Sequence, residues 1–266
     1  MTRRLLALFP AVLLLLDIAT PAAAETPEEK GLRIAQAARD RDAGWGDYRA
    51  AGTMVLRNRQ GQESVRRFHS SALEVPRDGD KTLMVFTWPG DIEGTALLTI
   101  AHDTADDDQW LYLPALKRVK RISSGDRSGS FLGSEFAYED LVPQAVEKYS
   151  YAWLRDEPCS ADAQLACFVY ERFPTKDSGY SRQVVWRDKE EYRVIRIDYY
   201  DRKGAHLKTL TAADYAEYLD RYWRPGEMLM VNHQNGKSTL LRWSEYEFGT
   251  GLRDQAFSRR ALERAR

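Results

Sequence analysis

Segments with strand character follow one another at hairpin spacing along most of this chain, from about residue 48 to residue 248. Residues 48–57 and 63–75, for example, flank a turn from Asn58 to Gly61, and residues 82–88 are almost entirely apolar. Short apolar or alternating runs between turn residues are typical of antiparallel strands. About eleven strands at this spacing, with few helices, predict a mainly β protein built on a large, strongly curved sheet or barrel.

A sheet that curls in this way has an apolar concave face, which must be filled by side chains or covered. Aromatic residues alternate on several predicted strands, as at Trp110 and Tyr112. Each ring taken alone is most simply explained as ordinary core. As a group they are candidates to line a cavity, and these candidates are Trp88, Trp110, Tyr112, Trp153 and Trp186.

Three helical pieces are expected beside the sheet. Thr26 suits an N-cap, Pro27 suits the first helical position and Glu29 completes a capping box, so a helix is predicted from there to about residue 41. A short helix is expected around residues 135–141 and a C-terminal helix over about 252–265. Both are interpreted as covering pieces.

The first residues have the pattern of a secretory signal peptide. Arg3 and Arg4 form a positive region, residues 5–19 are mostly apolar, and Ala22 to Ala24 fit a small-residue cleavage site. The apolar run is too short and wrongly flanked for a membrane-spanning helix. We therefore expect cleavage of residues 1–24, export of a soluble protein, and one domain over residues 25–266.

The two cysteines, Cys159 and Cys167, lie close together in the sequence. In an oxidising compartment an even number of cysteines at short spacing favours a disulfide over two unrelated buried thiols. Such a bridge would pin the base of a hairpin loop and stabilise the fold by roughly 2–3 kcal/mol. The spacing excludes a CxxC redox site.

The charge balance argues against nucleic acid as a partner. The formal net charge is −1, and loss of Arg3, Arg4 and Asp17 with the signal peptide removes two positive charges and one negative charge, giving −2. Nucleic-acid binding depends on neutralising phosphates with a basic surface, which this balance does not favour.

No enzyme motif stands out. HExxH and GxSxG are absent, and the four histidines are scattered. The acidic run from Asp103 to Asp108 lacks the spacing and glycine of an EF-hand, so a solvated turn is the simpler interpretation. We therefore expect no catalysis, no metal and no other cofactor. A hydrolase whose Ser, His and Asp converge only in space is the weaker alternative.

The stretch from Trp110 to Leu141 combines a strand, a basic run and a Ser/Gly-rich loop over residues 123–133. Two large apolar residues, Phe131 and Leu132, lie in this polar loop, and such a pair is normally covered by the protein itself or by a ligand. The segment is interpreted as a lid over the concave face. The candidate lid residues are Phe131, Leu132, Phe136 and Tyr138.

Several segments also carry a family resemblance. They are residues 93–98, 110–114 with 118–122, 131–141, 198–204 with 208–209, 222–225 and 251–263. In these segments the chain resembles the periplasmic outer-membrane lipoprotein-sorting (LolA-like) proteins, in a branch of uncharacterised members associated with lipid-exporting transporters. The resemblance covers nearly the whole chain after residue 24.

The resemblance implies an incomplete, half-open antiparallel β-barrel whose apolar concavity is covered by helices and loops. It further implies a non-catalytic periplasmic carrier that binds the acyl chains of lipoproteins or lipids for transfer towards the outer membrane. An inner-membrane transporter and an outer-membrane acceptor are the additional partners implied. The alternative is a periplasmic adaptor or sensor module that docks envelope proteins or a lipid-exporting transporter, with the loop at Phe131 and Leu132 as the docking site.

Overall fold

The computed structural model describes residues 24–159 and 164–265 of the chain. The predicted signal peptide therefore lies, except for its last residue, outside the described part. Within the described part, thirteen strands form one antiparallel sheet that is open at both edges. No described helix is both long enough and apolar enough to cross a bilayer.

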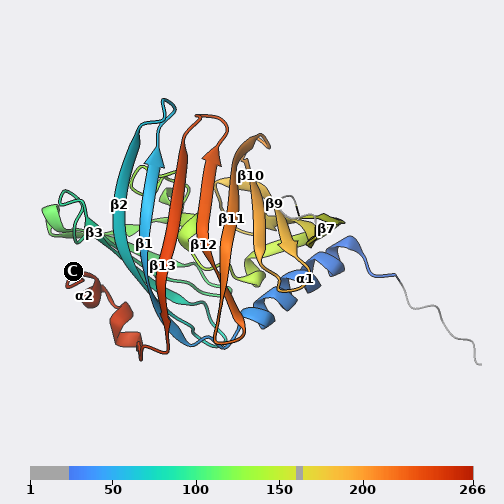
Figure 1. Ribbon diagram of the computed structural model, residues 1–266, viewed down its shortest axis with the longest axis horizontal. Coiled ribbons are helices and arrows are strands. Elements are labelled where there is room, and N and C mark those ends of the chain that lie inside the picture. Colours follow the sequence, from blue (N-terminus) through green and yellow to red (C-terminus); the bar gives the residue numbers. More distant parts are fainter. Residues whose placement is uncertain (1–23, 160–163, 266) are drawn as a thin grey trace, which may run out of the picture.

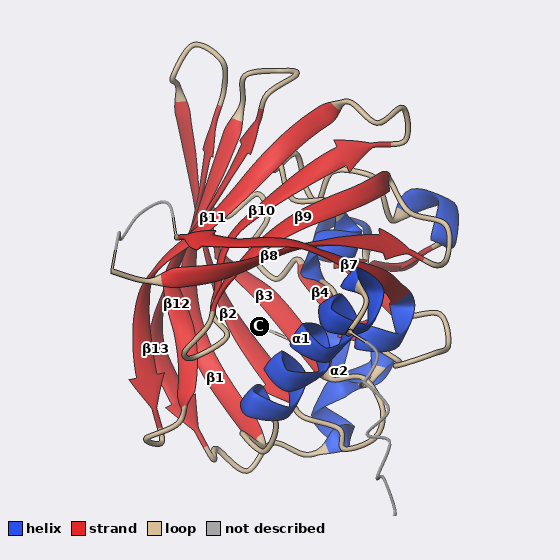
Figure 2. Ribbon diagram, turned by 90° about the vertical axis from the view of Figure 1, so that its right-hand side faces the viewer, coloured by secondary structure: helices blue, strands red, loops and turns tan. Residues whose placement is uncertain are grey.

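The strands are β1 (Asp47–Arg57), β2 (Glu63–Leu73), β3 (Lys81–Trp88), β4 (Ala96–Ile100), β5 (Asp108–Leu113), β6 (Arg118–Ile122), β7 (Tyr149–Pro158), β8 (Ala166–Pro174), β9 (Tyr180–Asp188), β10 (Val194–Asp201), β11 (His206–Tyr218), β12 (Tyr222–Asn232) and β13 (Ser238–Phe248). The helices are α1 (Pro27–Asp42) and α2 (Arg259–Leu262). Figure 2 shows how strongly the sheet curves.

The order of strands in the sheet is β6-β5-β4-β3-β2-β1-β13-β12-β11-β10-β9-β8-β7. The first and last strands of the chain are thus neighbours in the middle of the sheet, where β1 pairs with β13 (Figure 1). Strands that follow one another in the chain are also neighbours in the sheet, with one exception. That exception is β6 and β7, which form the two opposite edges. The segment between β6 and β7 must therefore pass from one edge to the other.

The predicted mainly β fold, a half-open antiparallel barrel, is confirmed, although the sheet has thirteen described strands rather than about eleven. The edge strand β6 shows why a count from sequence falls short. Only Ile122 of its five residues is buried, so the strand gives little apolar signal. Edge strands of this polar kind are common because an apolar free edge would favour aggregation.

Helix α1 begins where the sequence predicts. Thr26 accepts a hydrogen bond from the Glu29 amide at 3.2 Å, and the Glu29 carboxylate accepts one from the Thr26 amide at 2.9 Å. The helix then packs closely on β7, because a Cβ atom at Gly31 would lie 3.0 Å from the backbone nitrogens of Ala152 and Trp153. The glycine permits this approach, which brings Ile34 into the main core.

The other two expected helices are shorter than predicted. The region 135–141 contains only a 3-10 turn, Tyr138–Leu141. The C-terminal region divides into a 3-10 turn, Asp254–Phe257, and α2, because Ser258 is extended and caps α2 by accepting a hydrogen bond from the Ala261 amide. An N-cap in the middle of a predicted helix interrupts it.

The predicted disulfide is present. It joins Cys159, just after β7, to Cys167 in β8, and the two Cα atoms lie 5.2 Å apart. The bridge closes the β7–β8 hairpin near the free edge of the sheet, where fewer backbone hydrogen bonds hold the strand.

The two faces of the sheet carry separate apolar clusters. Side chains alternate between faces along a strand, so Leu97 belongs to the large cluster on the concave face and Leu98 to a smaller cluster on the outer face. The outer cluster includes Phe257 and Leu262 from the C-terminal segment, which therefore covers β3 to β5 from outside. The concave cluster includes residues from α1 and from the β6–β7 connection.

The half-buried carboxyl group of Asp80, just before β3, makes the stability of the fold pH-dependent. Burial, partly offset by a hydrogen bond from the Val75 amide, raises the pKa of Asp80 to about 6, and the nearby carboxylate of Glu74 also contributes. The unfolded-state pKa is about 3.9, so the folded protein binds more protons between these values. The contribution of Asp80 to the free energy of unfolding therefore falls as the pH rises from about 4 to about 6.

Asp80→Asn should consequently raise the free energy of unfolding at pH 7.5 by about 1–2 kcal/mol, after allowance for partial solvent screening. The gain should vanish near pH 4, where the wild-type carboxyl group is already neutral. Urea unfolding at the two pH values measures this difference. An equal gain at both would contradict the titration and leave only a local packing effect.

Candidate ligand-binding concavity

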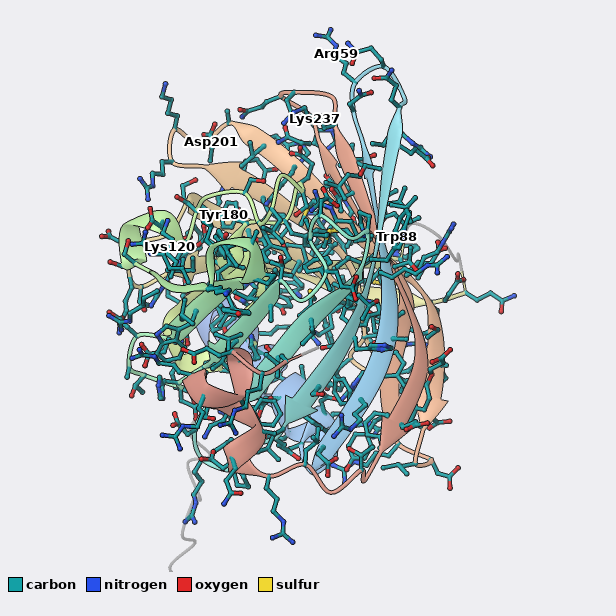
Figure 3. All side chains as sticks on the ribbon, turned by 90° about the vertical axis from the view of Figure 1, so that its left-hand side faces the viewer. Arg59, Trp88, Lys120, Tyr180, Asp201 and Lys237 are labelled. Atoms are coloured by element: carbon teal, nitrogen blue, oxygen red, sulfur yellow. A yellow bond between two sulfur atoms is a disulfide. The ribbon has the colours of Figure 1, made fainter. Side chains whose placement is uncertain are left out.

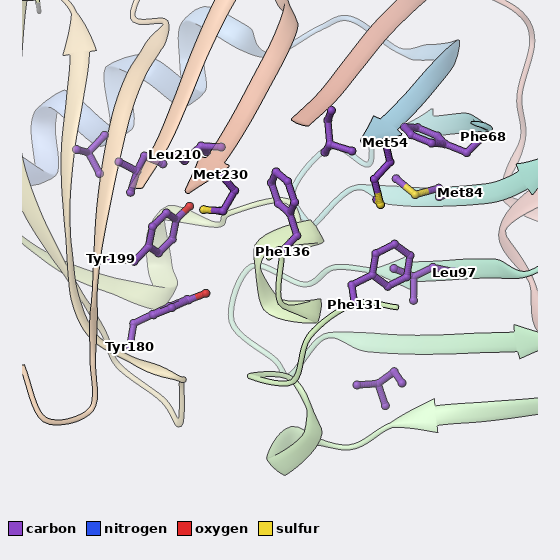
Figure 4. Close-up of a cluster of buried hydrophobic side chains, with 14 of the residues drawn as sticks. Met54, Phe68, Met84, Leu97, Phe131, Phe136, Tyr180, Tyr199, Leu210 and Met230 are labelled. Atoms are coloured by element: carbon purple, nitrogen blue, oxygen red, sulfur yellow. The ribbon is translucent and has the colours of Figure 1, made fainter. Parts of the chain in front are cut away.

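The β6–β7 connection crosses the concave face of the sheet. Its part from residue 123 to residue 141, here called the lid segment, folds back on itself as a tight loop: the Phe131 amide donates to the Phe136 carbonyl at 2.8 Å, and Ser130 forms an isolated bridge with Ala137. The loop directs the side chains of Phe131 and Phe136 towards the sheet (Figure 4).

These two aromatic rings occupy the middle of the concave cluster. Phe131 is 0% exposed and its ring lies 5.9 Å from that of Phe86, centroid to centroid. Phe136 is 1% exposed, and Figure 4 shows it between the methionines of β12 and β1, Met230 and Met54. In this conformation the lid segment fills the concavity of the sheet with its own side chains.

Leu132 and Tyr138, the other two candidate lid residues, are half-buried and pack against the same cluster. Leu132 has a φ of 50°, in the left-handed region, which is unfavourable for a residue with a branched side chain. Arg66 of β2 donates to the Leu132 carbonyl at 2.7 Å and so helps to hold this turn in place.

Polar contacts attach the lid segment to strands on both sides of the concavity. Glu135 is the centre of one set: its amide donates to Thr239 of β13 at 2.9 Å, and its carboxylate accepts from Asn232 of β12 at 2.7 Å. On the other side, Gln109 of β5 donates to the Tyr138 carbonyl at 3.0 Å.

A buried ion pair also attaches the lid segment to the sheet. Lys208 of β11 lies 2.6 Å from Asp140 of the lid segment and also donates to the Glu135 carbonyl at 2.9 Å. The Lys208 and Asp140 side chains are only 5% and 3% exposed. Tyr180 of β9 donates to the second oxygen of Asp140 at 2.7 Å. Burial, and then the charge of Asp140, raise the pKa of Tyr180, so its hydroxyl stays protonated.

A hollow lies at the tip of the lid segment, beside the turns that join β1 to β2 and β12 to β13. Its volume is about 230 Å³, and its lining includes Leu56, Gly133, Glu135 and Thr239. Figure 3 shows Arg59 and Lys237 at this end of the sheet. The lid tip is therefore reachable from solvent at this end.

The predicted cavity-lining aromatics divide between the faces. Trp153 of β7 packs against the concave cluster, with the Lys30 ammonium 3.5 Å from its ring centroid. Trp110 and Tyr112 of β5 instead belong to the outer cluster beneath the C-terminal segment. Their expected place in the concavity was wrong, because alternation shows that residues share a face but not which face it is.

Trp88 and Trp186 also lie outside the concave cluster. Trp88, at the end of β3, is 48% exposed. Trp186 points outwards, because the preceding residue, Val185, points into the concave cluster. On the outer face the Trp186 indole donates to Glu157 at 2.6 Å and its ring stacks on Arg196. Both places correct the sequence-based expectation.

Two residues that the sequence interpretation overlooked are the buried cations of the concave face, Lys208 and Arg172. A signal for them exists, since each is a charged residue inside a strand. Charged residues in strands are usually assigned to the solvent-exposed face of a sheet, and only the register of the strands places Lys208 and Arg172 on the concave face. Among the described residues, no group of three or more His, Cys, Asp or Glu side chains could hold a metal ion.

A curved, open antiparallel sheet with a hydrophobic lid segment in its concavity defines a half-barrel class that solved structures also contain. An outer membrane lipoprotein-sorting protein domain from Vibrio parahaemolyticus is 52% identical to this chain, with a TM-score of 0.86; the match covers 89% of this chain and 99% of that one. A DUF1329 family protein from Desulfovibrio piger is 30% identical, with a TM-score of 0.82 and coverage of 89% and 99%.

A LolA superfamily protein from Nitrosomonas europaea shares the fold at 20% identity, with a TM-score of 0.68 and coverage of 87% and 98%. The model of a family described as "Uncharacterized protein" matches residues 78–264. No curated protein matches the chain. This chain belongs to the DUF1329 family, together with the outer membrane lipoprotein-sorting domain that is 52% identical to it, and it shares the fold of the LolA superfamily protein. The family resemblance seen in its sequence is thus confirmed.

Proposed function

We propose that this protein is a non-catalytic periplasmic carrier that binds the acyl chains of lipoproteins or lipids in its concavity, for transfer towards the outer membrane. The observation that carries the proposal is the complete burial of Phe131 and Phe136 from a loop that belongs to no strand. These rings hold the place of an apolar ligand, and the candidate lid residues Leu132 and Tyr138 lie around them.

The energetics of such a carrier require a self-filled empty state. Each CH₂ group of an acyl chain that leaves water gains about 0.8 kcal/mol, and an open apolar groove without ligand would lose a comparable amount. When the rings of the lid segment fill the groove, ligand binding exchanges one apolar filling for another. The exchange keeps the net affinity moderate, as handover to an acceptor requires.

The family supplies the coarse context of this proposal. A relative with 52% identity is named as an outer membrane lipoprotein-sorting domain, so transfer of lipid-modified cargo across the periplasm suits this chain. The donor would be an inner-membrane transporter and the acceptor an outer-membrane component. The hollow beside Gly133 and Glu135 offers an entrance for a chain that displaces the lid tip.

Native mass spectrometry of the full chain, exported to and purified from a bacterial periplasm, tests the proposal. We expect bound lipid in part of the protein, and displacement of a fluorescent acyl probe by added lipid after the protein has been delipidated. If no lipid co-purifies and no acyl probe binds, the carrier function is wrong. A photo-crosslinker at residue 131 that captures a protein and never a lipid would instead favour an envelope-protein adaptor.

A further inference from the structure

A row of polar side chains crosses the concave face between β8 and β11. Pairing in the sheet places Arg172 opposite Gln183, Gln183 opposite Tyr199, and Tyr199 opposite Lys208. Directly paired residues point to the same face, and Tyr199 belongs to the concave cluster. The two cations of the row therefore point into the concavity, where Arg172 is 8% and Lys208 is 4% exposed.

The two cations differ in what neutralises them. Lys208 pairs with Asp140 of the lid segment. Arg172 has no carboxylate within 4.0 Å among the described residues, and the hydrogen bond found for its guanidinium runs from Nε to Gln183 at 2.7 Å. A buried charge without a counter-ion is costly, by several kcal/mol. An anion bound from outside would offset this cost.

The surroundings of Arg172 suit an anion. The ring of Tyr149 lies 4.6 Å from the guanidinium carbon, and Tyr151 is its direct partner on β7. Tyr170 lies two residues before Arg172 on the same face of β8, and Tyr199 is paired with Gln183 on β9. Burial raises the pKa of Tyr149, Tyr151 and Tyr199, so their hydroxyls remain protonated and add no negative charge beside the guanidinium. The Tyr149 hydroxyl donates to Gln144 and the Tyr151 hydroxyl donates to the Val146 carbonyl.

A hollow at the surface is separated from Arg172 by the ring of Tyr149. This hollow, of about 70 Å³, opens between the end of the lid segment and the start of β7, and Tyr149, Gln144 and Glu139 contribute to its lining. Because Tyr149 contacts both the hollow and Arg172, rotation of its ring would join them.

We propose that Arg172 binds the anionic group, a phosphate or a carboxylate, of an acyl-chain ligand whose hydrocarbon tail lies in the concavity. This inference rests on the proposed carrier function and narrows the cargo to anionic amphiphiles. The planar guanidinium can bind such a group through two parallel hydrogen bonds. The bound anion supplies the negative charge that neutralises the Arg172 guanidinium.

Binding of two amphiphiles with the same tail tests the assignment. Hexadecyl phosphate and hexadecanol are titrated against the delipidated full-length protein, using displacement of a fluorescent acyl probe, with inorganic phosphate as a third competitor. We expect the wild type to bind hexadecyl phosphate about 10-fold or more tighter than hexadecanol, as charge-assisted hydrogen bonds allow. Arg172→Gln should abolish this preference and leave hexadecanol binding nearly unchanged.

Arg182→Gln is the matched control, because Arg182 pairs with Glu171 at 2.5 Å and faces the other side of the sheet. It should keep the preference. Thermal unfolding separates binding from folding: Arg172→Gln and Arg172→Met should be at least as stable as the ligand-free wild type, since they remove an unpaired buried charge. If Gln is not tolerated, Met serves in the titration. A marked loss of stability in both would assign Arg172 a structural role and overturn the proposal.

The remaining outcomes are distinct. Equal affinity of the wild type for the two amphiphiles overturns the anion site and leaves the carrier function standing. Absence of binding to both overturns the carrier function itself. Competition by inorganic phosphate as strong as that by hexadecyl phosphate would show a free-anion site and overturn the headgroup assignment.

Discussion

Lys208→Met should lower the free energy of unfolding by about 3–5 kcal/mol, because removal of one partner leaves the other buried charge without compensation. Among the described residues, the substitution leaves Asp140, which is 3% exposed, with hydrogen bonds only from Tyr180 and the Ala137 amide. The Glu135 carbonyl also loses its donor. Equilibrium unfolding in urea, followed by tryptophan fluorescence, measures the loss.

Two further variants make the result specific. Arg242→Met breaks the pair between Arg242 and Glu227, whose side chains are 59% and 35% exposed, and should cost less than about 1 kcal/mol. The double variant Lys208→Met with Asp140→Leu should recover most of the loss, since it leaves no unpaired charge. A single Lys208 variant as stable as the wild type would mean that the pair does not hold the lid segment.

Phe131→Ala should cost about 3–5 kcal/mol, the usual range for truncating a fully buried aromatic residue. It should also leave an apolar void beneath the lid segment, next to Phe86. Such voids stay dry and accept apolar molecules. We therefore expect the variant to bind a fluorescent acyl probe more tightly than the wild type, while it unfolds at a lower temperature.

The pairing of these two effects is what identifies a lid. Leu116→Ala, at a residue that is 67% exposed, should change stability by less than about 0.5 kcal/mol and leave probe binding unaltered. If Phe131→Ala loses stability and probe binding together, the ring is part of the binding surface and not a filler that the ligand replaces.

Local patterns determined much of this structure in advance. The capping box at Thr26, the disulfide between Cys159 and Cys167 and the mainly β, half-open sheet are each confirmed. They depend on residues close in sequence, or on alternation repeated many times. The burial of Phe131 could likewise be expected, since a polar loop that carries a large apolar residue needs a cover for it.

Assignments to one face of the sheet could not be made in the same way. Trp110 and Tyr112 alternate as predicted, but the C-terminal segment covers them from the outer side. The burial of the two cations depends on the register of four neighbouring strands. Arg172 and Lys208 lie in one row because Arg172 pairs with Gln183, Gln183 with Tyr199, and Tyr199 with Lys208. Long-range pairing of this kind leaves no trace in a local pattern.

The position of the lid segment between the two free edges of the sheet has a mechanical consequence. It follows β6 directly and is joined to β7 by residues 142–148, so the lid segment is tethered to both edges of the sheet rather than hinged at one. A ligand that enters beneath the lid segment must either move the two edges of the sheet apart or extend the lid segment. The lid segment can extend by unwinding its 3-10 turns at Ser124–Asp126 and Tyr138–Leu141. Each residue that straightens there adds roughly 1.3 Å.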